Sequence, residues 1–125
     1  MPRSPRPPKA PVSFDTVREL ALALPGVEEG TSYGTPALKV KGKFLLRLRE
    51  DGESLAVRLD FDTRDLRLQA DPEAFFLTDH YRGYPAILVR LSAVSIEALQ
   101  EVIEEAWRFV APKRLVAQRE ARKAD

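Results

Sequence analysis

Residues 36–59 read PALKVKGKFLLRLREDGESLAVRL. Apolar and polar side chains alternate here in three short runs, and a period of two residues is the signature of a β-strand. Gly42 separates the first two runs, and the turn-forming residues 50–53 separate the second from the third. The stretch therefore predicts a meander of three antiparallel strands, with Lys41-Gly42-Lys43 as a tight hairpin turn.

Helices are predicted on both sides of this meander. Apolar residues at helical spacing predict a helix over 13–24, and Pro25-Gly26 ends it. A longer apolar stripe predicts a second helix over 95–111, with Trp107 among its buried residues. Both helices begin at a serine, a residue that favours the N-cap position.

The remaining segments give weaker patterns. Asp62 can cap a short helix that runs to about Gln69, and residues 86–91 alternate as a further strand. Residues 75–77 fit either a short strand or a buried connector, and 79–85 read as an irregular loop. We expect a short basic helix over 113–121.

The length and composition predict one domain. A chain of 125 residues with 44% hydrophobic residues suffices for a single core. We assign this domain to 12–118, between a proline-rich, disordered basic tail at 1–11 and a frayed basic end at 119–125. The expected fold is an α+β two-layer sandwich, in which an antiparallel sheet of about five strands carries the helices on one face.

The overall charge and the cysteine content exclude several classes of function. The formal net charge is +1, which gives no global attraction to nucleic acids or membranes. No cysteine is present, so a disulfide, a thiolate nucleophile and a zinc finger are excluded. We find neither a membrane-spanning apolar run nor the apolar core of a signal peptide. We therefore expect a cytoplasmic protein without a membrane partner, and a monomer as the default.

Three segments resemble the MmcQ/YjbR family, as does the order of the predicted elements over about residues 13–116. The segments are Leu24-Pro25-Gly26-Val27-Glu28-Glu29, Lys39-Val40-Lys41-Gly42-Lys43-Phe44 and Ala111-Pro112-Lys113-Arg114-Leu115. The resemblance implies a frataxin-like sandwich, and it implies DNA binding because members are commonly described so. Many members carry an Asn and a Trp before the strand at 86–91, where this chain has His80-Tyr81-Arg82-Gly83-Tyr84-Pro85.

The predicted hairpin is rich in basic residues. Its candidate nucleic-acid contacts, together with one arginine of the 79–85 loop, are Lys39, Lys41, Lys43, Arg47, Arg49 and Arg82. A basic β-ribbon can follow the phosphates of DNA in a salt-sensitive and sequence-independent way. The alternative is a solvated sheet face whose lysines protect an edge strand.

The loops at 31–36 and 79–85 form a second candidate site. Tyr33, His80, Arg82 and Tyr84 supply stacking rings, an imidazole and an anion-binding group. These residues predict a pocket for a protein segment or a small ligand. The alternative is that the tyrosines of the 79–85 loop pack it against the core.

A catalytic signature is missing from the sequence. We find no nucleophile–base pair and no set of metal ligands, and the acidic residues near the first helix are too few for a frataxin-like iron site. We therefore expect a non-enzymatic binding protein without a cofactor. Its two candidate functions are DNA binding through the hairpin and ligand binding through the loops.

Overall fold

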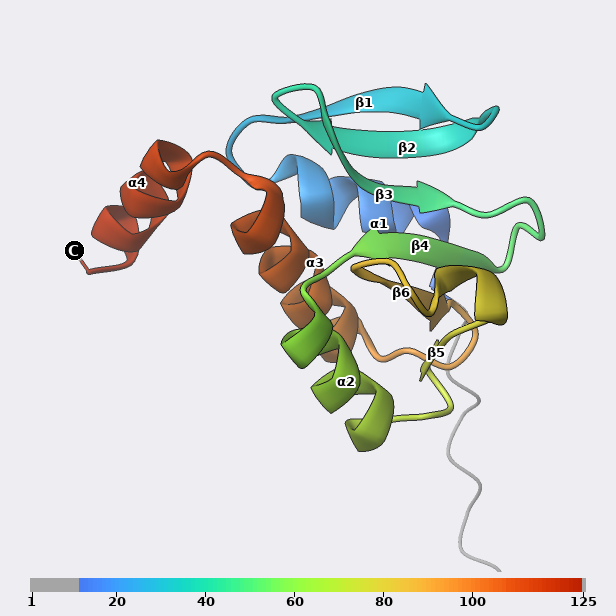
Figure 1. Ribbon diagram of the computed structural model, residues 1–125. Coiled ribbons are helices and arrows are strands. Elements are labelled where there is room, and N and C mark those ends of the chain that lie inside the picture. The colour runs from blue at the N-terminus through green and yellow to red at the C-terminus, as the bar shows by residue number, and fades with distance from the viewer. Residues whose placement is uncertain (1–11, 125) are drawn as a thin grey trace, which may run out of the picture.

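The computed structural model describes residues 12–124, and the predicted tail at 1–11 lies outside them. These residues form a two-layer α+β sandwich, in which one antiparallel sheet carries helices on one face (Figure 1). This is the predicted fold class.

The sheet has six strands in the order β1-β2-β3-β4-β6-β5, and every neighbouring pair is antiparallel. The strands are β1 (Val27–Ser32), β2 (Thr35–Val40), β3 (Lys43–Leu48), β4 (Ser54–Arg58), β5 (Phe75–Phe76) and β6 (Ala86–Arg90). The meander β2-β3-β4 is the predicted one. The expected number was about five; β5 is only two residues long, too short for an alternating pattern to identify it.

Two tight turns orient the first three strands. Lys41 and Gly42 have φ of 50° and 81°, and Tyr33 and Gly34 have φ of 52° and 78°. Positive φ at both central residues defines the type I′ turn, whose twist matches that of a hairpin. The predicted Lys41-Gly42 turn is confirmed, and the second turn places Tyr33 at the opposite end of β2.

An irregularity between β2 and β3 changes which side chains share a face. Leu38 pairs with Leu46, but its neighbour Lys39 pairs with Phe44, so that β3 carries one extra residue. Paired residues project from the same face of a sheet, whereas consecutive residues project from opposite faces. Phe44 therefore lies on the face opposite Leu46. The simple alternation predicted for β3, with both residues on one face, is wrong at this position.

Within residues 12–124 four α-helices accompany the sheet: α1 (Phe14–Leu22), α2 (Phe61–Ala70), α3 (Ile96–Val110) and α4 (Lys113–Ala124). The 79–85 segment, expected to be an irregular loop, begins with a 3-10 helix, η1 (Asp79–Tyr81). Ser13 and Ser95 cap α1 and α3 as predicted. The cap of α2 is Asp60 rather than Asp62, because the Asp60 carboxylate accepts from the backbone N–H of Thr63. Helices α1 and α3 pack on one face of the sheet (Figure 1), and the core lies between the layers.

The C-terminal helix α4 continues to Ala124, although fraying was expected from residue 119. Glu104 of α3 explains the difference. It accepts hydrogen bonds from Arg119, Lys123 and Arg108, with the shortest from Arg119 Nη2 at 2.9 Å. Ion pairs with Glu104 thus stabilise the last turns of α4, a basic helix that has few buried residues of its own.

The Glu104 cluster predicts a pH dependence of stability. Hydrogen bonds from Arg119 first, and then from Lys123 and Arg108, outweigh burial and lower the pKa of Glu104 from 4.5 to about 2. A lowered pKa stabilises the fold above pH 4.5, and this contribution is lost as the pH falls from 4.5 toward 2. Glu104→Gln is expected to cost about 2–3 kcal/mol at neutral pH.

Urea unfolding of the wild type and Glu104→Gln at several pH values tests this expectation. The difference between the two should shrink on acidification, because protonation removes the same charge. Glu97→Gln is the matched control, since Glu97 is exposed on the same helix. A pH-independent difference would contradict the assigned role of the Glu104 charge.

Candidate functional site

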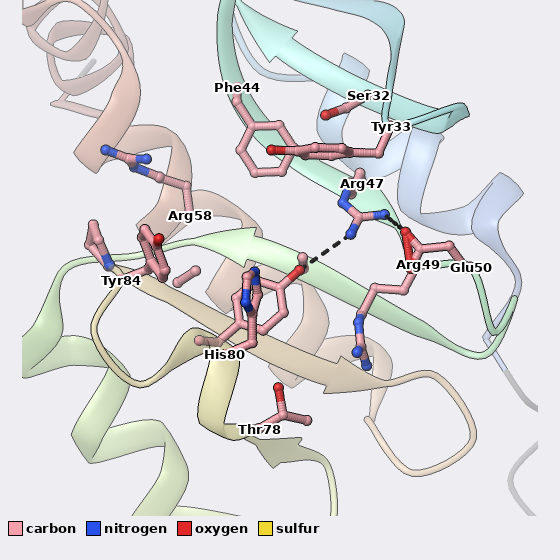
Figure 2. Close-up of a pocket in the computed structure, with 14 residues that line it drawn as sticks. Ser32, Tyr33, Phe44, Arg47, Arg49, Glu50, Arg58, Thr78, His80 and Tyr84 are labelled. Atoms are coloured by element: carbon pink, nitrogen blue, oxygen red, sulfur yellow. Dashed lines mark hydrogen bonds and ion pairs between the residues drawn. The ribbon is translucent and has the colours of Figure 1, made fainter.

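A cleft of about 770 Å³ opens on the face of the sheet that the helices leave uncovered (Figure 2). Its residues come from β3, β4, the β1–β2 turn and the segment before β6. They are Ser32, Tyr33, Phe44, Arg47, Arg49, Glu50, Ala56, Arg58, Thr78, His80, Tyr81, Tyr84, Pro85 and Ala86. The volume is in the range typical of ligand-binding pockets.

Strand register explains why these residues meet. Ala56 pairs with Arg47, and Arg58 pairs with Ala86, so all four side chains project from one face. The residues on either side of Ala56 belong to the core cluster beneath the sheet. Ala56 and Ala86 form the floor of the cleft, and their small side chains leave open space above the strands.

Aromatic residues form two opposing sides of the cleft. Tyr33 and Phe44 lie on one side, and His80 and Tyr84 lie on the other (Figure 2). Tyr33 is 86% exposed and Tyr84 is 56% exposed. The His80 ring lies 5.9 Å from that of Tyr84, measured between centroids. Large rings exposed to this degree are available for stacking on a planar ligand.

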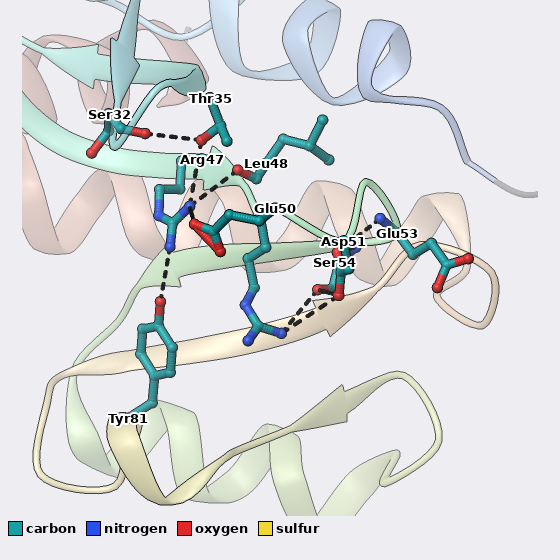
Figure 3. A network of polar contacts seen from close by, with 10 residues as sticks. Ser32, Thr35, Arg47, Leu48, Glu50, Asp51, Glu53, Ser54 and Tyr81 are labelled. Carbon is teal, nitrogen blue, oxygen red and sulfur yellow. Dashed lines mark hydrogen bonds and ion pairs between the residues drawn. The ribbon is translucent and has the colours of Figure 1, made fainter.

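Arg47 is the buried centre of the polar contacts in the cleft (Figure 3). Its Nη1 donates to Glu50 Oε1 at 2.8 Å, and its Nη2 donates to Tyr81 Oη at 3.3 Å. The guanidinium also lies 5.1 Å from the centroid of the Tyr33 ring. Arg47 therefore links the β1–β2 turn to the 79–85 segment across the floor of the cleft.

The charges around Arg47 stabilise one another. Burial disfavours its charged form, but the hydrogen bonds to Glu50 and Tyr81 outweigh burial and raise the pKa of Arg47. The hydrogen bond from Arg47 in turn lowers the pKa of Glu50. Arg47 is thus a charged structural element whose two Nη atoms are already hydrogen-bonded.

Arg49 and Arg58 retain donors for a ligand. Arg49 Nη1 donates to Ser54 Oγ at 3.1 Å and lies 3.7 Å from Asp51 Oδ2, whereas its Nη2 has no hydrogen-bond partner among the described residues. Arg58 is exposed, and within residues 12–124 it makes no hydrogen bond or salt bridge. With Glu50 as the carboxylate and Arg47, Arg49 and Arg58 as cations, the cleft has an excess of positive charge.

Arg64 of α2 holds the 79–85 segment in place. Its Nη1 donates to the carbonyl oxygens of Arg82 and Tyr84, both at 3.0 Å, and its side chain is buried. Hydrogen bonds from a charged donor are stronger than those between neutral groups. A helix on the other layer of the sandwich therefore supports one wall of the cleft.

The predicted site residues divide between two places. Tyr33, His80, Tyr84, Arg47 and Arg49 all line the cleft. The structure thus combines most of the predicted pocket with two residues of the predicted basic hairpin.

Four other predicted residues do not line the cleft: Lys39, Lys41, Lys43 and Arg82. Lys41 and Lys43 are exposed at the far end of β2, and the side chain of Lys39 lies against Gly30 of β1. Arg82 is 67% exposed, and its Nε donates to Asp79 at 2.9 Å. The predicted basic hairpin thus has Arg47 and Arg49 in the cleft and its three lysines outside it.

Sequence reasoning did not select Arg58, Phe44 and Glu50, which also line the cleft, whereas it considered Tyr81 as a stacking residue of the 79–85 loop. Arg58 had a detectable signal, since it lies on the polar side of the predicted third strand. Phe44 had none, because its face depends on the pairing with β2.

Within 12–124, no group of three or more His, Asp or Glu side chains is arranged to hold a metal ion. No helix in this part of the chain is both long and apolar enough to cross a membrane.

The fold and the cleft define a small, helix-backed α+β domain. A family model described as YjbR matches residues 22–109, and the chain belongs to the YjbR family. The predicted family resemblance is thus confirmed.

Three relatives of this chain are named only as uncharacterized proteins. Uncharacterized proteins of Mycobacterium tuberculosis and Mycobacterium bovis are 44% identical over 66 residues, which are 52% of this chain and 51% of theirs. The matched stretch thus spans about half the length of these relatives. The crystal structure of Deinococcus radiodurans protein DR2400 has a similar fold, with a TM-score of 0.67 and 21% identity. That similarity covers 80% of this chain and 79% of the other.

Proposed function

We propose that this protein is a non-enzymatic binding module, and that its ligand carries both phosphate groups and planar rings, as nucleotides and nucleic acids do. One observation carries the proposal: exposed tyrosines and incompletely paired arginines face the same open cleft. Aromatic rings stack on bases, and guanidinium groups bind phosphate oxygens with directed hydrogen bonds.

The alternative sources of affinity are weaker. Metal coordination has no support in the described residues. A purely apolar ligand would desolvate Arg58, which has no counter-charge among the described residues, and this is unfavourable. A ligand with phosphates and rings uses both kinds of side chain at once.

Fluorescence anisotropy with a labelled, mixed-sequence single strand of about 16 nucleotides tests the proposal at roughly 50 and 200 mM salt. We expect salt-sensitive binding that Tyr33→Ala weakens about 5- to 150-fold, because removing a stacking platform costs about 1–3 kcal/mol per base. Tyr33 is a suitable position because it is almost fully exposed, so its replacement leaves the core unchanged.

Phe109→Ala is the matched control, since Phe109 is an exposed aromatic residue of α3 on the other layer. Its affinity should equal that of the wild type. The absence of binding to single strands, duplexes and nucleoside triphosphates alike would refute the proposed function.

Duplex DNA binding through the hairpin is a second candidate function. It is favoured by the exposure of Lys41 and Lys43 beside the β2–β3 turn, where a groove of DNA would be accessible. A Lys41→Glu/Lys43→Glu variant separates the two candidates. This variant should lose duplex binding if the hairpin binds the phosphates, and it should retain cleft binding if the cleft is the site.

A further inference from the structure

We infer that the cleft takes a short stretch of single-stranded nucleic acid, laid along β4 with its phosphates at Arg58 and Arg49 and its bases between the aromatic walls. This inference rests on the proposed function and specifies its ligand. The ligand is a single strand rather than a duplex, it follows β4, and it is short.

The two arginines mark the ends of the cleft. Figure 2 shows Arg58 and Arg49 at opposite ends of the hollow, with Tyr33 on one side and His80 and Tyr84 on the other. Arg49 is hydrogen-bonded through its backbone to Ser54, the first residue of β4, and Arg58 is the last residue of that strand. A line of positive charge therefore follows β4 from end to end.

The length of β4 sets the length of the ligand. Ser54 and Arg58 are four residues apart, which corresponds to roughly 13 Å along an antiparallel strand. A stacked nucleic-acid strand advances roughly 3.4 Å per nucleotide and an unstacked one advances further, so this distance accommodates at most about four nucleotides. A mononucleotide would reach only one of the two arginines.

The aromatic walls favour a single strand over a duplex. The bases of a duplex stack inside the double helix, and their faces are inaccessible to side chains. Tyr33 and Tyr84 are the most exposed tyrosines of the described chain, and they lie across the cleft from one another. They gain a stacking partner only when the bases are unpaired.

Arg47 prepares the site without being its main phosphate ligand. Both of its Nη atoms are hydrogen-bonded, to Glu50, Tyr81, Leu48 and Thr35, and its guanidinium lies against the Tyr33 ring. Arg58 and the Nη2 atom of Arg49 have no hydrogen-bond partner among the described residues, and they lie at the two ends of the cleft, where the backbone of a bound strand would pass.

The test measures the binding of oligothymidylates from one to about six nucleotides, the short end of the range for single-strand sites. Affinity should rise up to about four nucleotides and then level off. On the four-nucleotide ligand, Arg49→Ala and Arg58→Ala should each lower the slope of log K against log salt by about 0.7, the value for one phosphate contact on a single strand.

Controls separate this inference from charge and stability effects. Arg114→Ala removes an equal charge from the exposed surface of α4 and should leave affinity and salt slope unchanged. Arg49 also donates a hydrogen bond to Ser54, so Arg49→Ala can affect stability as well as charge. Arg49→Lys is therefore measured alongside, because it keeps the charge and should retain the salt slope.

The outcomes separate a failure of the single-strand inference from a failure of the proposed function. If thymidine monophosphate binds as tightly as the four-nucleotide ligand, or a duplex as tightly as a single strand, the inference is overturned while the cleft remains a nucleotide site. Unchanged salt slopes in both arginine variants would overturn it as well. If no nucleotide ligand of any length binds, the proposed function itself fails.

Discussion

Replacing Trp107 by alanine is expected to lower the free energy of unfolding by about 3–5 kcal/mol. The side chain is fully buried in the centre of the core cluster, between the helices and the sheet. Its Nε1 donates to the carbonyl oxygen of Pro25 at 2.8 Å, which fastens α3 to the turn before β1. The change removes a large apolar surface, leaves a cavity and frees that carbonyl group.

The loss is large against the total stability of a small domain, which is about 5–15 kcal/mol. Chemical denaturation followed by circular dichroism should show a markedly lower midpoint. Trp107→Phe retains most of the packing but not the donor, so its cost should be smaller. Phe109→Ala, at a half-exposed position two residues further along α3, should change stability little. An equal loss in Phe109→Ala and Trp107→Ala would show that Trp107 is not the centre of the core.

Replacing Arg64 by methionine is expected to cost about 2–3 kcal/mol, because two charge-assisted hydrogen bonds are lost. Methionine keeps an unbranched apolar chain but carries no donor for the carbonyl oxygens of Arg82 and Tyr84. It also loses the contact of the guanidinium with the Phe61 ring and the ion pair with the exposed Asp65, which contributes little. The wall of the cleft then loses its support from α2. Hydrogen exchange at 79–85 should accelerate more than exchange in the β2–β3 hairpin.

Arg82→Met is the matched control in the same wall. Its side chain is mostly exposed and reaches only Asp79, and exposed ion pairs contribute little to stability. Exchange at 79–85 should therefore stay close to that of the wild type in this variant. If Arg64→Met leaves the exchange at 79–85 unchanged, Arg64 does not hold this wall.

The parts of the fold that were predictable from the sequence depend on interactions between residues that are close together along the chain. Ser13 and Ser95 cap their helices through contacts three residues away, and Lys41-Gly42 forms its turn by its own backbone preferences. The meander followed from alternation within short runs. The C-terminal helix was predicted too short, because its last turns depend on the pairing of Arg119 and Lys123 with Glu104.

The candidate site was predictable only in pieces. Tyr33, His80 and Tyr84 were identified as pocket residues and Arg47 and Arg49 as basic hairpin residues, but their common location was not expected. Arg82 was assigned to both sites because of its charge, and its backbone rather than its side chain supports the cleft. The position of Phe44 depends on one extra residue in β3, which no period in the sequence reveals.

The sequence by itself determined the helices, the meander, their turns and the family, because periodicity, capping and turn chemistry act over a few residues. Only the tertiary structure decided that an arginine of β3 and a tyrosine 34 positions later share a hydrogen bond. It also decided that Arg49 and Arg58 lie at the two ends of the same cleft. Pairing between strands that are far apart in the sequence determines which side chains meet.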